Sequence, residues 1–391
     1  MGIALFWAPL GWVWLVPLLY FLAVLLGQGV IVWLAAHMPD LTPEMVESGF
    51  LPVEVSVIIP ARNEGGDLER CLDDLGRQDL LQHGGRMEVV VVDGGSTDGT
   101  AASARAHPLA PAVLDEPPLP EGWVGKNWAC HQGAARAHGE VLLFLDADVR
   151  LHPSAVRAGV SRLRSTGADL VTFAARIEME GFWERVVMPL FVQFVLLYFL
   201  APRVNLDRSS RAMANGQFMC FSRAGYQRSG GHLGVKGAVL EDVRLAQEVK
   251  RRGGRVRIFW APELLSTRMY SNRREMAEGI LKNLHGTRFS ALRQIVLASA
   301  IFLYFLSPFL AVGLALLGWL PAPWLLFSLL LVLLTAVKQV GFQRAVDVPL
   351  RYGLLYPVGC VYYLGLFARS LAQGLRGGKV TWKGRTYDMD A

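Results

Sequence analysis

Hydrophobic positions form long uncharged runs near both ends of the chain and short runs between them. Residues 1–37 and 294–337 contain no Asp, Glu, Lys or Arg. The apolar run from about 12 to 36 is long enough to cross a bilayer, which takes about 20 residues, and tryptophans lie near its ends. It lacks a basic leader and is too long for a signal-peptide core. The pattern therefore predicts a retained transmembrane anchor within residues 1–40.

Three further apolar segments, at about 295–317, 324–340 and 354–371, predict about three transmembrane helices within residues 295–372. Residues 266–294 form a basic, amphipathic juxtamembrane segment containing Arg268, Arg273, Arg274, Lys282, Arg288 and Arg293. This basic block places the region before it in the cytoplasm. Residues 373–391 form a basic tail with Arg376, Lys379, Lys383 and Arg385. Single crossings throughout would put that tail outside, against the positive-inside tendency, so a re-entrant C-terminal segment stays an alternative.

Short β-branched runs alternate with polar turns and helical stretches between the two apolar ends. The expected strands are 55–60, 87–93, 141–148, 169–177, 215–222 and 255–258. The expected helices include 67–80, with Asp67 as N-cap, 125–138 and 242–251. This repetition predicts an α/β domain at residues 50–265 with a parallel sheet and ligands at the strand ends.

One apolar stretch within this domain, 186–200, is broken by Pro189 and closed by Pro202. It is too short and interrupted for a confident span, so we interpret the region near 186–204 as an interfacial or re-entrant helix. A buried core helix is the alternative.

Composition agrees with a membrane protein that carries a polar domain. Of the 391 residues, 52% are hydrophobic and only 18% charged, and the mean hydropathy of +0.32 is high for a soluble enzyme. The net charge of +6 is spread along the chain without a basic, aromatic-rich patch, so nucleic-acid binding is not expected. The four cysteines lack metal-ligand spacing and indicate reduced thiols.

Polar side chains follow several of the expected strands. Asp146 and Asp148 end an apolar run, and strand alternation would place them on one side, where they could hold a divalent cation that carries phosphates. An ordinary polar turn is the alternative. Asp93, at another strand end, could accept hydrogen bonds from a ribose or base. Lys126 follows Gly125 and precedes a helix, where it could contact a phosphate or a base, although the pattern alone favours an exposed loop lysine.

A further pair of acids, Glu241-Asp242, opens a helix. Acids in a first helical turn usually serve the helix dipole, but one of them could be a general base.

Taken together, these motifs resemble family 2 glycosyltransferases with the GT-A fold. The resemblance covers about residues 53–262 and rests on Val57-Ile-Ile-Pro60-Ala-Arg-Asn-Glu64, Asp93-Gly-Gly-Ser-Thr-Asp-Gly-Thr100, Asp146-Ala-Asp148 and Glu241-Asp242, in that order. Finer patterns are Gly122-Trp-Val-Gly-Lys-Asn-Trp-Ala129, Asn215-Gly-Gln-Phe-Met219 and Glu278-Gly-Ile-Leu-Lys-Asn283. They resemble a membrane branch that contains carotenoid (diaponeurosporenoate-type) and hopanoid-associated glycosyltransferases.

The resemblance implies an α/β GT-A domain, a Rossmann-like fold for nucleotide-diphospho-sugar transferases, with transmembrane helices at both ends. It implies roles for individual residues. Asp242 would be the catalytic base, with Glu241 as its substitute, and Asp148 with Asp146 would hold Mg²⁺ or Mn²⁺. The donor would contact Pro60, Ala61, Arg62, Glu64, Asp93, Gly125, Lys126 and Asp146. The residues assigned to the acceptor side are Trp183, Gln217, His232, Lys282 and Asn283.

The implied reaction is an inverting, metal-dependent transfer of one sugar from a nucleotide-sugar, often a UDP-sugar, to a membrane lipid such as a carotenoid, another terpenoid or a glycolipid. Residues 271–283 lack the Gln-x-x-Arg-Trp motif of processive members, which favours a single transfer. The expected location is the inner membrane, multi-pass, with a cytoplasmic catalytic domain. A polyprenyl-phosphate glycosyl synthase and a membrane scaffold with a degenerate GT-A domain are the alternatives. An acceptor hydroxyl and an acceptor carboxylate both remain open.

Overall fold

The structure, a computed structural model, describes residues 4–286, 291–375, 379–382 and 385–388. The chain forms two compact units. The helical unit comprises Met1–Ala36, Met179–Leu197 and Tyr270–Met389, and the sheet unit comprises His37–Glu178, Tyr198–Met269 and Asp390–Ala391. Both units are therefore discontinuous in sequence.

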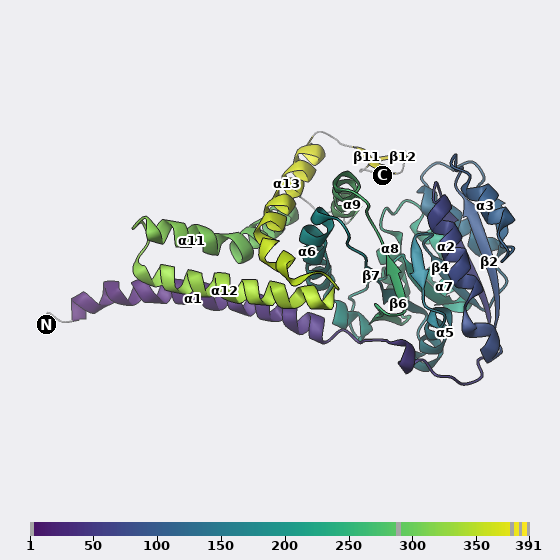
Figure 1. The fold of residues 1–391 in the computed structure, drawn as a ribbon, viewed down its shortest axis with the longest axis horizontal. Helices are drawn as coiled ribbons and strands as arrows, with labels where there is room; N and C mark the ends of the chain where they lie inside the picture. Colours follow the sequence, from purple (N-terminus) through teal and green to yellow (C-terminus); the bar gives the residue numbers. More distant parts are fainter. Residues whose placement is uncertain (1–3, 287–290, 376–378, 383–384, 389–391) are drawn as a thin grey trace. The chain divides into compact units, whose positions relative to one another are not determined.

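Helices and strands alternate in the middle of the chain, as the sequence predicts, and helices predominate at its ends (Figure 1). The helices are α1 (Ala4–Ala36), α2 (Gly65–Gly76), α3 (Thr100–Ala106), α4 (Gly125–Arg136), α5 (Ala155–Thr166), α6 (Phe182–Phe199), α7 (Arg223–Ser229), α8 (Glu241–Arg251), α9 (Arg273–Gly286), α10 (Ala291–Ile301), α11 (Ser307–Leu316), α12 (Ala322–Ala345) and α13 (Tyr356–Leu375). The strands are β1 (Glu54–Ala61), β2 (Arg86–Asp93), β3 (Ala112–Asp115), β4 (Val141–Leu145), β5 (Val149–Leu151), β6 (Leu170–Ala174), β7 (Arg176–Ile177), β8 (Phe218–Ser222), β9 (Val256–Trp260), β10 (Leu265–Thr267), β11 (Lys379–Trp382) and β12 (Arg385–Asp388).

Short helical turns complete the described chain: η1 (Pro43–Met45), η2 (Asp79–His83), η3 (Ala201–Asn205), η4 (His232–Val235), η5 (Phe302–Leu306) and η6 (Leu350–Leu355).

The sheet unit is built, in its described residues, on a seven-stranded sheet with the order β3-β2-β1-β4-β8-β6-β9. Strand β1 runs parallel to β2, with Ala61 opposite Asp93, and parallel to β4. Strand β8 is antiparallel to both β4 and β6. The sheet is therefore mixed, and the expected all-parallel sheet is wrong at β8. Hydrophobic patterning reports burial and carries no information on strand direction.

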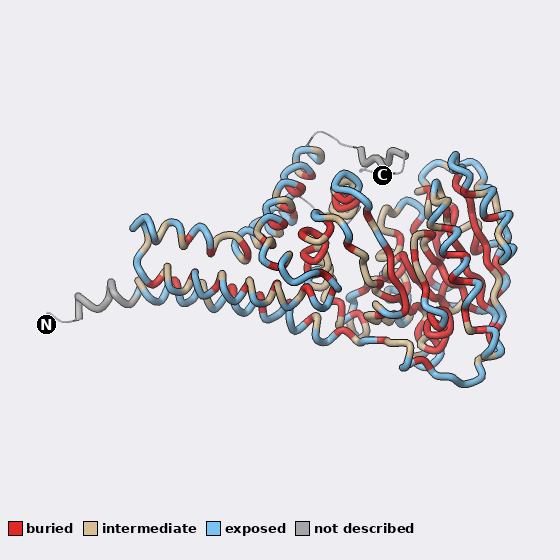
Figure 2. The backbone as a smooth tube through the Cα atoms, viewed as in Figure 1, coloured by how far each residue is buried: buried red, intermediate tan, exposed pale blue. Residues whose placement is uncertain are grey.

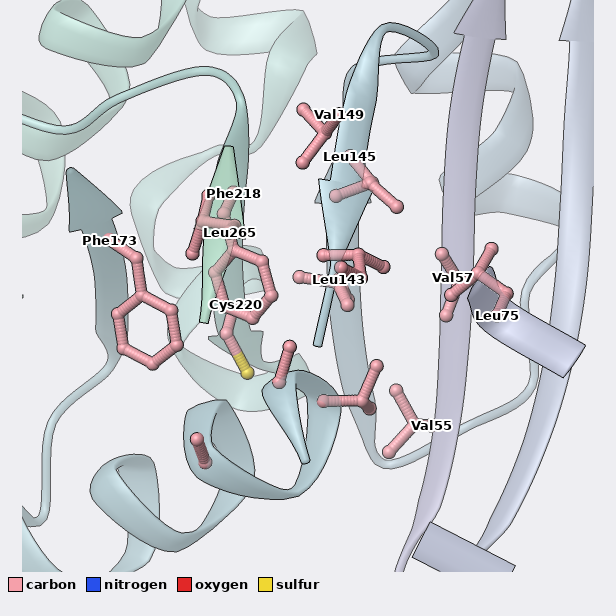
Figure 3. Packing of buried hydrophobic residues seen from close by; sticks show 14 of the residues in the cluster. Val55, Val57, Leu75, Leu143, Leu145, Val149, Phe173, Phe218, Cys220 and Leu265 are labelled. Carbon is pink, nitrogen blue, oxygen red and sulfur yellow. The ribbon is translucent and has the colours of Figure 1, made fainter. Parts of the chain in front are cut away.

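The core of the sheet unit follows from the alternation of side chains along its strands. Val57 and Ile59 of β1 join residues of α2 and α5 in one buried cluster, which Figure 3 shows from close by. Ile58 points to the other face, where a Cβ on Gly133 of α4 would lie only 2.4 Å from its Cγ2. Glycine thus lets α4 pack closely on β1. Figure 2 shows the buried strands as the continuous red interior of this unit.

Several element boundaries in the sheet unit differ from the sequence prediction. Strand β4 ends at Leu145, and Asp146–Asp148 form a turn before β5, so the two aspartates do not alternate on one strand. Helix α2 begins at Gly65, which places Asp67 in its first turn and Glu64 at its N-cap. The expected strand 169–177 is split between β6 and β7, which belong to different sheets. Strands β3 and β10 are additional.

In the helical unit, five segments among the described residues are long and apolar enough to cross a membrane: Trp12–Ala36, Phe182–Phe199, Ala291–Leu316, Ala322–Ala345 and Leu350–Gly374. Four of them match the predicted anchor and the three C-terminal segments. The fifth, α6, is longer than its sequence pattern indicates because Pro189 lies inside the helix without ending it. Its interfacial placement stays a prediction. Within this unit α1 packs along α12 (Figure 1).

Parts of the predicted basic regions fall outside the described residues, namely Arg288, Arg376 and Lys383. Residues 379–382 and 385–388 of the tail form the hairpin β11–β12.

Candidate active site

The loops after β1 and β2 are joined by hydrogen bonds at the carboxyl edge of the sheet. Asn63 Oδ1 accepts from the Thr97 backbone N–H at 2.8 Å, and the Glu64 N–H donates to Thr100 Oγ1 at 3.0 Å. Arg62 donates to the Gly94 carbonyl at 3.1 Å. The segment from Pro60 to Glu64, which the sequence assigns to nucleotide-sugar binding, therefore lies against the loop after Asp93. The parallel pairing of β1 with β2 brings these two loops together.

Asp93 is the last residue of β2. One of its carboxylate oxygens accepts hydrogen bonds, and the other accepts none from the described residues. Oδ2 accepts the backbone N–H groups of Gly95 and Ser96, at 3.2 and 3.0 Å. Oδ1 is buried and has no hydrogen-bond partner among the described residues. A buried acceptor without a partner costs free energy, about 1–3 kcal/mol. The site is therefore suited to a ligand that offers an N–H or O–H donor.

A charged cluster in the sheet unit is formed by Lys126, Asp146 and Glu241. Lys126 Nζ lies 2.6 Å from Asp146 Oδ1 and 2.9 Å from Glu241 Oε1. The three residues come from the start of α4, the end of β4 and the start of α8. The sequence predicted all three as site residues, and the fold brings them together.

The charged cluster keeps the Lys126 side chain protonated. Burial alone lowers the pKa of the Lys126 ammonium, but the neighbouring carboxylates Asp146 and Glu241 outweigh that effect and raise the pKa well above its ordinary value. Lys126 is therefore a permanent cation. Its side chain retains 32% exposure, so it can also reach a ligand. An exposed, unpartnered loop lysine, the alternative interpretation, is wrong.

Asp242, next to Glu241, is oriented by the backbone. The Gly216 N–H donates to Oδ2 at 2.9 Å and the Val243 N–H donates to Oδ1 at 2.7 Å. Burial and the charge of Glu241 raise the pKa of Asp242 to about 6, against the lowering effect of Lys126. A carboxylate of that basicity accepts a proton near neutral pH more readily than an ordinary aspartate does.

Gly216 allows this arrangement because it has no side chain. A Cβ at this position would lie 3.0 Å from Lys126 Nζ, 3.3 Å from Glu241 Oε1 and 3.4 Å from Asp242 Oδ2. The sequence analysis did not single out Gly216. Its position beside Gln217 in the motif Asn215-Gly-Gln was the available signal.

Asn127 is a second residue that the sequence analysis missed. Its buried side-chain amide donates to the carbonyls of Val235, Lys236 and Ala238, at 2.9, 3.1 and 2.9 Å. These bonds tie the first turn of α4 to the segment that leads into α8. The signals in the sequence were its place directly after Lys126 and within the motif Gly122-Trp-Val-Gly-Lys-Asn-Trp-Ala129.

Asp148, the main predicted metal ligand, is half-buried in the turn after β4 and accepts a hydrogen bond from Thr267 Oγ1 at 3.2 Å. Thr267 belongs to β10, which the sequence did not predict. Among the described residues, no three or more His, Cys, Asp or Glu side chains are gathered as a metal site. The protein thus offers two aspartates on one turn, of which Asp146 also binds Lys126.

The residues assigned to the acceptor side are divided between the two units. Gln217 accepts from Asn215 Nδ2 at 2.8 Å, and its carbonyl accepts from the Asp146 N–H at 3.4 Å. His232 is fully buried in η4 and bonds Tyr226 Oη through Nδ1 at 2.8 Å. Burial lowers the pKa of His232 to about 3, so it is neutral. Trp183, Lys282 and Asn283 belong to the helical unit.

Comparison with known proteins identifies the family of the sheet unit's central segment. Residues 56–230 match the family model "Glycosyl transferase family 2". Two similar curated proteins are both named 4,4'-diaponeurosporenoate glycosyltransferase. The one from Staphylococcus haemolyticus is 27% identical over 59% of this chain and 60% of its own length. The one from Staphylococcus aureus strain MRSA252 is 25% identical over 86% of this chain and 88% of its own.

Among solved structures, a mannosyltransferase from Pyrobaculum calidifontis in complex with GDP-Man and Mn²⁺ is similar, with a TM-score of 0.46 and 18% identity over 88% of this chain and 98% of its own.

The matched segment contains Asp93, Asp146 and Asp148, which follow or end strands of the mixed sheet, and it contains Lys126, which contacts Asp146. The chain thus carries a glycosyltransferase domain of family 2 at residues 56–230, built on a mixed α/β sheet.

Proposed function

We propose that the protein transfers a single sugar from a nucleotide-sugar to a membrane lipid, with inversion at the anomeric carbon. The observation that carries this proposal is the geometry of Asp242. Two backbone N–H groups fix its carboxylate beside the Lys126 cation, and its pKa is raised to about 6. An inverting single displacement needs one such base on the acceptor side of the reacting carbon.

The donor would lie along the carboxyl ends of β2, β1 and β4. The open Oδ1 of Asp93 would accept the imide N–H of a uracil ring, which favours a UDP-sugar. Lys126, with residual exposure at the start of α4, would contact the diphosphate. Gly125 precedes it as the first residue of the helix.

Mg²⁺ or Mn²⁺ fits the two aspartates after β4. Magnesium sites commonly combine one or two protein carboxylates with substrate phosphates, and Asp148 and Asp146 provide that number on one turn. When bound, the ion would neutralise charge that develops on the leaving diphosphate. Thr267 would hold the Asp148 carboxylate through its hydroxyl.

In the proposed step, an acceptor hydroxyl oxygen forms a bond to the anomeric carbon while the bond from that carbon to the diphosphate breaks. The bonding electrons leave with the nucleoside diphosphate, and the hydroxyl proton passes to Asp242. Lys126 would stabilise the negative charge of the leaving group. An acceptor carboxylate would already be ionised and would make the base dispensable.

Hydropathy and similarity support a lipid acceptor. The five candidate membrane segments would hold the protein at a bilayer, and the similar staphylococcal proteins are named for a carotenoid acid. The absence of a Gln-x-x-Arg-Trp motif in residues 271–283 supports one sugar per acceptor.

The test uses the full-length protein in nanodiscs with radiolabelled UDP-glucose, a carotenoid alcohol and Mg²⁺, with glycolipid product measured by mass spectrometry. We expect Asp242→Asn to bind UDP normally and to lose at least about a hundredfold in turnover, the usual contribution of a general base. Glu69→Gln, an exposed acid on α2, is the matched control and should be fully active. Undiminished turnover in Asp242→Asn would overturn the assigned base.

A further inference from the structure

The segment that follows helix α6 carries three arginines that the proposed reaction does not use. Arg203, Arg208 and Arg211 are exposed, and none of them forms an ion pair or a side-chain hydrogen bond within the described part of the chain. Residues 198–216 contain one acid, Asp207, and two arginines at the start of β9 already share its carboxylate. That acid therefore cannot offset the three positive charges of residues 203–211, which we call the arginine loop.

A lysine of helix α8 holds the arginine loop in place. Lys250 Nζ donates to three carbonyls of the loop, at 2.7, 2.9 and 3.1 Å, and thereby uses all of its ammonium protons. The acceptors are Val204, Leu206 and Ser209. Asn205 exchanges two further hydrogen bonds with the backbone of Ile258 in β9, at 2.9 and 2.7 Å. The backbone of the loop is therefore fixed, while its arginine side chains extend into solvent.

Helix α6 connects the arginine loop to the membrane. It is one of the apolar segments that are long enough to cross a bilayer, but the chain before it, up to Glu178, and the chain after it, from Tyr198, both belong to the sheet unit. A compact polar unit lies on one side of a bilayer, so a helix with both ends joined to that unit can enter the apolar layer but cannot cross it. The helix ends at Phe199, and Arg203 follows four residues later. In a bilayer, the loop would thus follow the point where α6 leaves the apolar layer.

The composition of this segment suits the headgroup region of a bilayer. Leu206 lies between the arginines and is 45% exposed, and Tyr198 at the end of α6 is 37% exposed. Arginines beside an exposed leucine and a tyrosine are typical of segments at a membrane surface, where apolar groups reach the acyl chains and cations meet phosphates. Arginine binds a phosphate through two parallel hydrogen bonds. A nucleic acid would also bind the arginines, but it would leave Leu206 in water.

We propose that the arginine loop binds the phosphate groups of anionic phospholipids at the bilayer surface, through Arg203, Arg208 and Arg211, with Leu206 inserted among the lipids. Lys250 belongs to the helix that begins with Glu241 and Asp242, so this contact would also fix that helix relative to the lipid surface. Lipid binding requires neither donor nor metal and is therefore measured independently of the proposed transfer reaction.

The test is photo-crosslinking of the full-length protein in phosphatidylcholine nanodiscs that contain a small fraction of azidobenzoyl-phosphatidylethanolamine, an anionic lipid labelled on its headgroup, followed by peptide mapping. We expect labelling within residues 203–211. Each single change, Arg203→Gln, Arg208→Gln or Arg211→Gln, should reduce labelling about fivefold, equivalent to about 1 kcal/mol, which is the usual effect of one basic residue near an anionic surface. The triple Gln variant should lose about a hundredfold, and the triple Lys variant, which keeps the charges, should retain most of the labelling.

The matched control removes three exposed arginines from other elements of the sheet unit, namely Arg77→Gln, Arg86→Gln and Arg136→Gln together. It has the same net charge as the triple loop variant and should label as the wild type does. A neutral probe, with the same azidobenzoyl group on diacylglycerol, should label the wild-type loop as weakly as the anionic probe labels the triple Gln variant. An unchanged melting temperature shows that the variants are folded.

Three outcomes would overturn the proposal. The first is equal labelling of the wild type and the triple Gln variant by the anionic probe. The second is equal labelling of the wild-type loop by the anionic and neutral probes. The third is loss of labelling in inorganic pyrophosphate at constant ionic strength, which would identify the loop as a site for a soluble phosphate compound rather than for lipid headgroups.

Discussion

The Lys126 ammonium lies 2.6 Å from Asp146 Oδ1 and thereby joins the start of helix α4 to the end of strand β4. Its second carboxylate contact, Glu241, is next to Asp242 in sequence. One cation therefore stands between the strand end assigned to the donor and the helix that carries the proposed base. Changes at Lys126 should affect both sides of the reaction.

Replacing Lys126 with Gln should weaken UDP binding and shift the pH dependence of turnover upward. The lysine charge lowers the pKa of Asp242, so its removal should raise the pH at which Asp242 loses its proton. The pH–rate profile and calorimetric UDP affinity measure the two effects. Arg136→Gln, at the exposed far end of α4, is the control. An unshifted profile would show that Lys126 does not act on the titrating group.

Turnover by the wild-type protein with a hydroxyl acceptor should fall as the pH drops below about 6. Asp242 must be ionised to accept a proton, and its pKa is raised to about 6. The pH dependence of folding stability runs opposite to that of turnover. A carboxyl group whose pKa is raised in the folded state stabilises the fold most when it is protonated. Its stabilising contribution is lost as the pH rises from about 4 to about 6. The free energy of unfolding of the wild-type protein should therefore fall relative to that of Asp242→Asn as the pH rises from about 4 to about 6, and a difference that stays constant over this range would contradict the assigned pKa.

Asp93→Asn should change the preferred base from uracil to cytosine. The asparagine oxygen would keep the Gly95 and Ser96 N–H bonds, so its NH₂ group would replace the unpartnered Oδ1. That group donates to N3 of cytosine but opposes the N3–H of uracil. UDP affinity should fall by at least about tenfold, or 1.4 kcal/mol, while CDP binds better than to the wild type. Titration with UDP and CDP measures this, and equal losses for both would contradict the assignment.

Gly216→Ala should reduce turnover without unfolding the protein. The added Cβ would lie 3.0 Å from Lys126 Nζ and 3.4 Å from Asp242 Oδ2, so the charged side chains must move. We expect a loss of about tenfold, the effect of about 1.4 kcal/mol on the barrier. Gly66→Ala, where the new Cβ meets no described atom within 4 Å, is the control and should be active.

Asp148→Ala should abolish the dependence of UDP binding on Mg²⁺ or Mn²⁺ while leaving the protein folded. The variant removes one of the two carboxylates on the turn after β4, and Asp146 already contacts Lys126. Calorimetry with UDP in the presence of each metal or of EDTA provides the measurement. Metal-dependent UDP binding that survives in Asp148→Ala would place the ion elsewhere.

The sequence patterns predicted the strands that position the site and several of its charged residues. Asp93 and Asp146 lie where apolar runs stop, and parallel strand ends meet at one edge, so their place at the same edge of the sheet was accessible from sequence. The contacts that orient Asp242 and Asp148 could not be predicted from the sequence. Gly216 and Thr267 reach Asp242 and Asp148 from distant segments, and their role depends on the mixed direction of β8 and on the short strand β10.

The apolar C-terminal helices of the helical unit lie where the sequence predicts apolar segments, but other features of this unit were not predicted. Helix α6 continues through Pro189, a residue whose local preference is to break helices. Arg273 lies against the rings of Trp183 and Tyr362, which are 179 residues apart in sequence, and no local periodicity links them.

The three hydrogen bonds from Asn127 join two parts of the site that come from different segments of the chain. They clamp the start of α4 to the segment 235–238, so that Lys126 on one side and Glu241 with Asp242 on the other belong to one stiff frame. The proposed leaving-group contact at Lys126 and the proposed base at Asp242 would thereby be held at a fixed separation by a side chain that has no exposed surface.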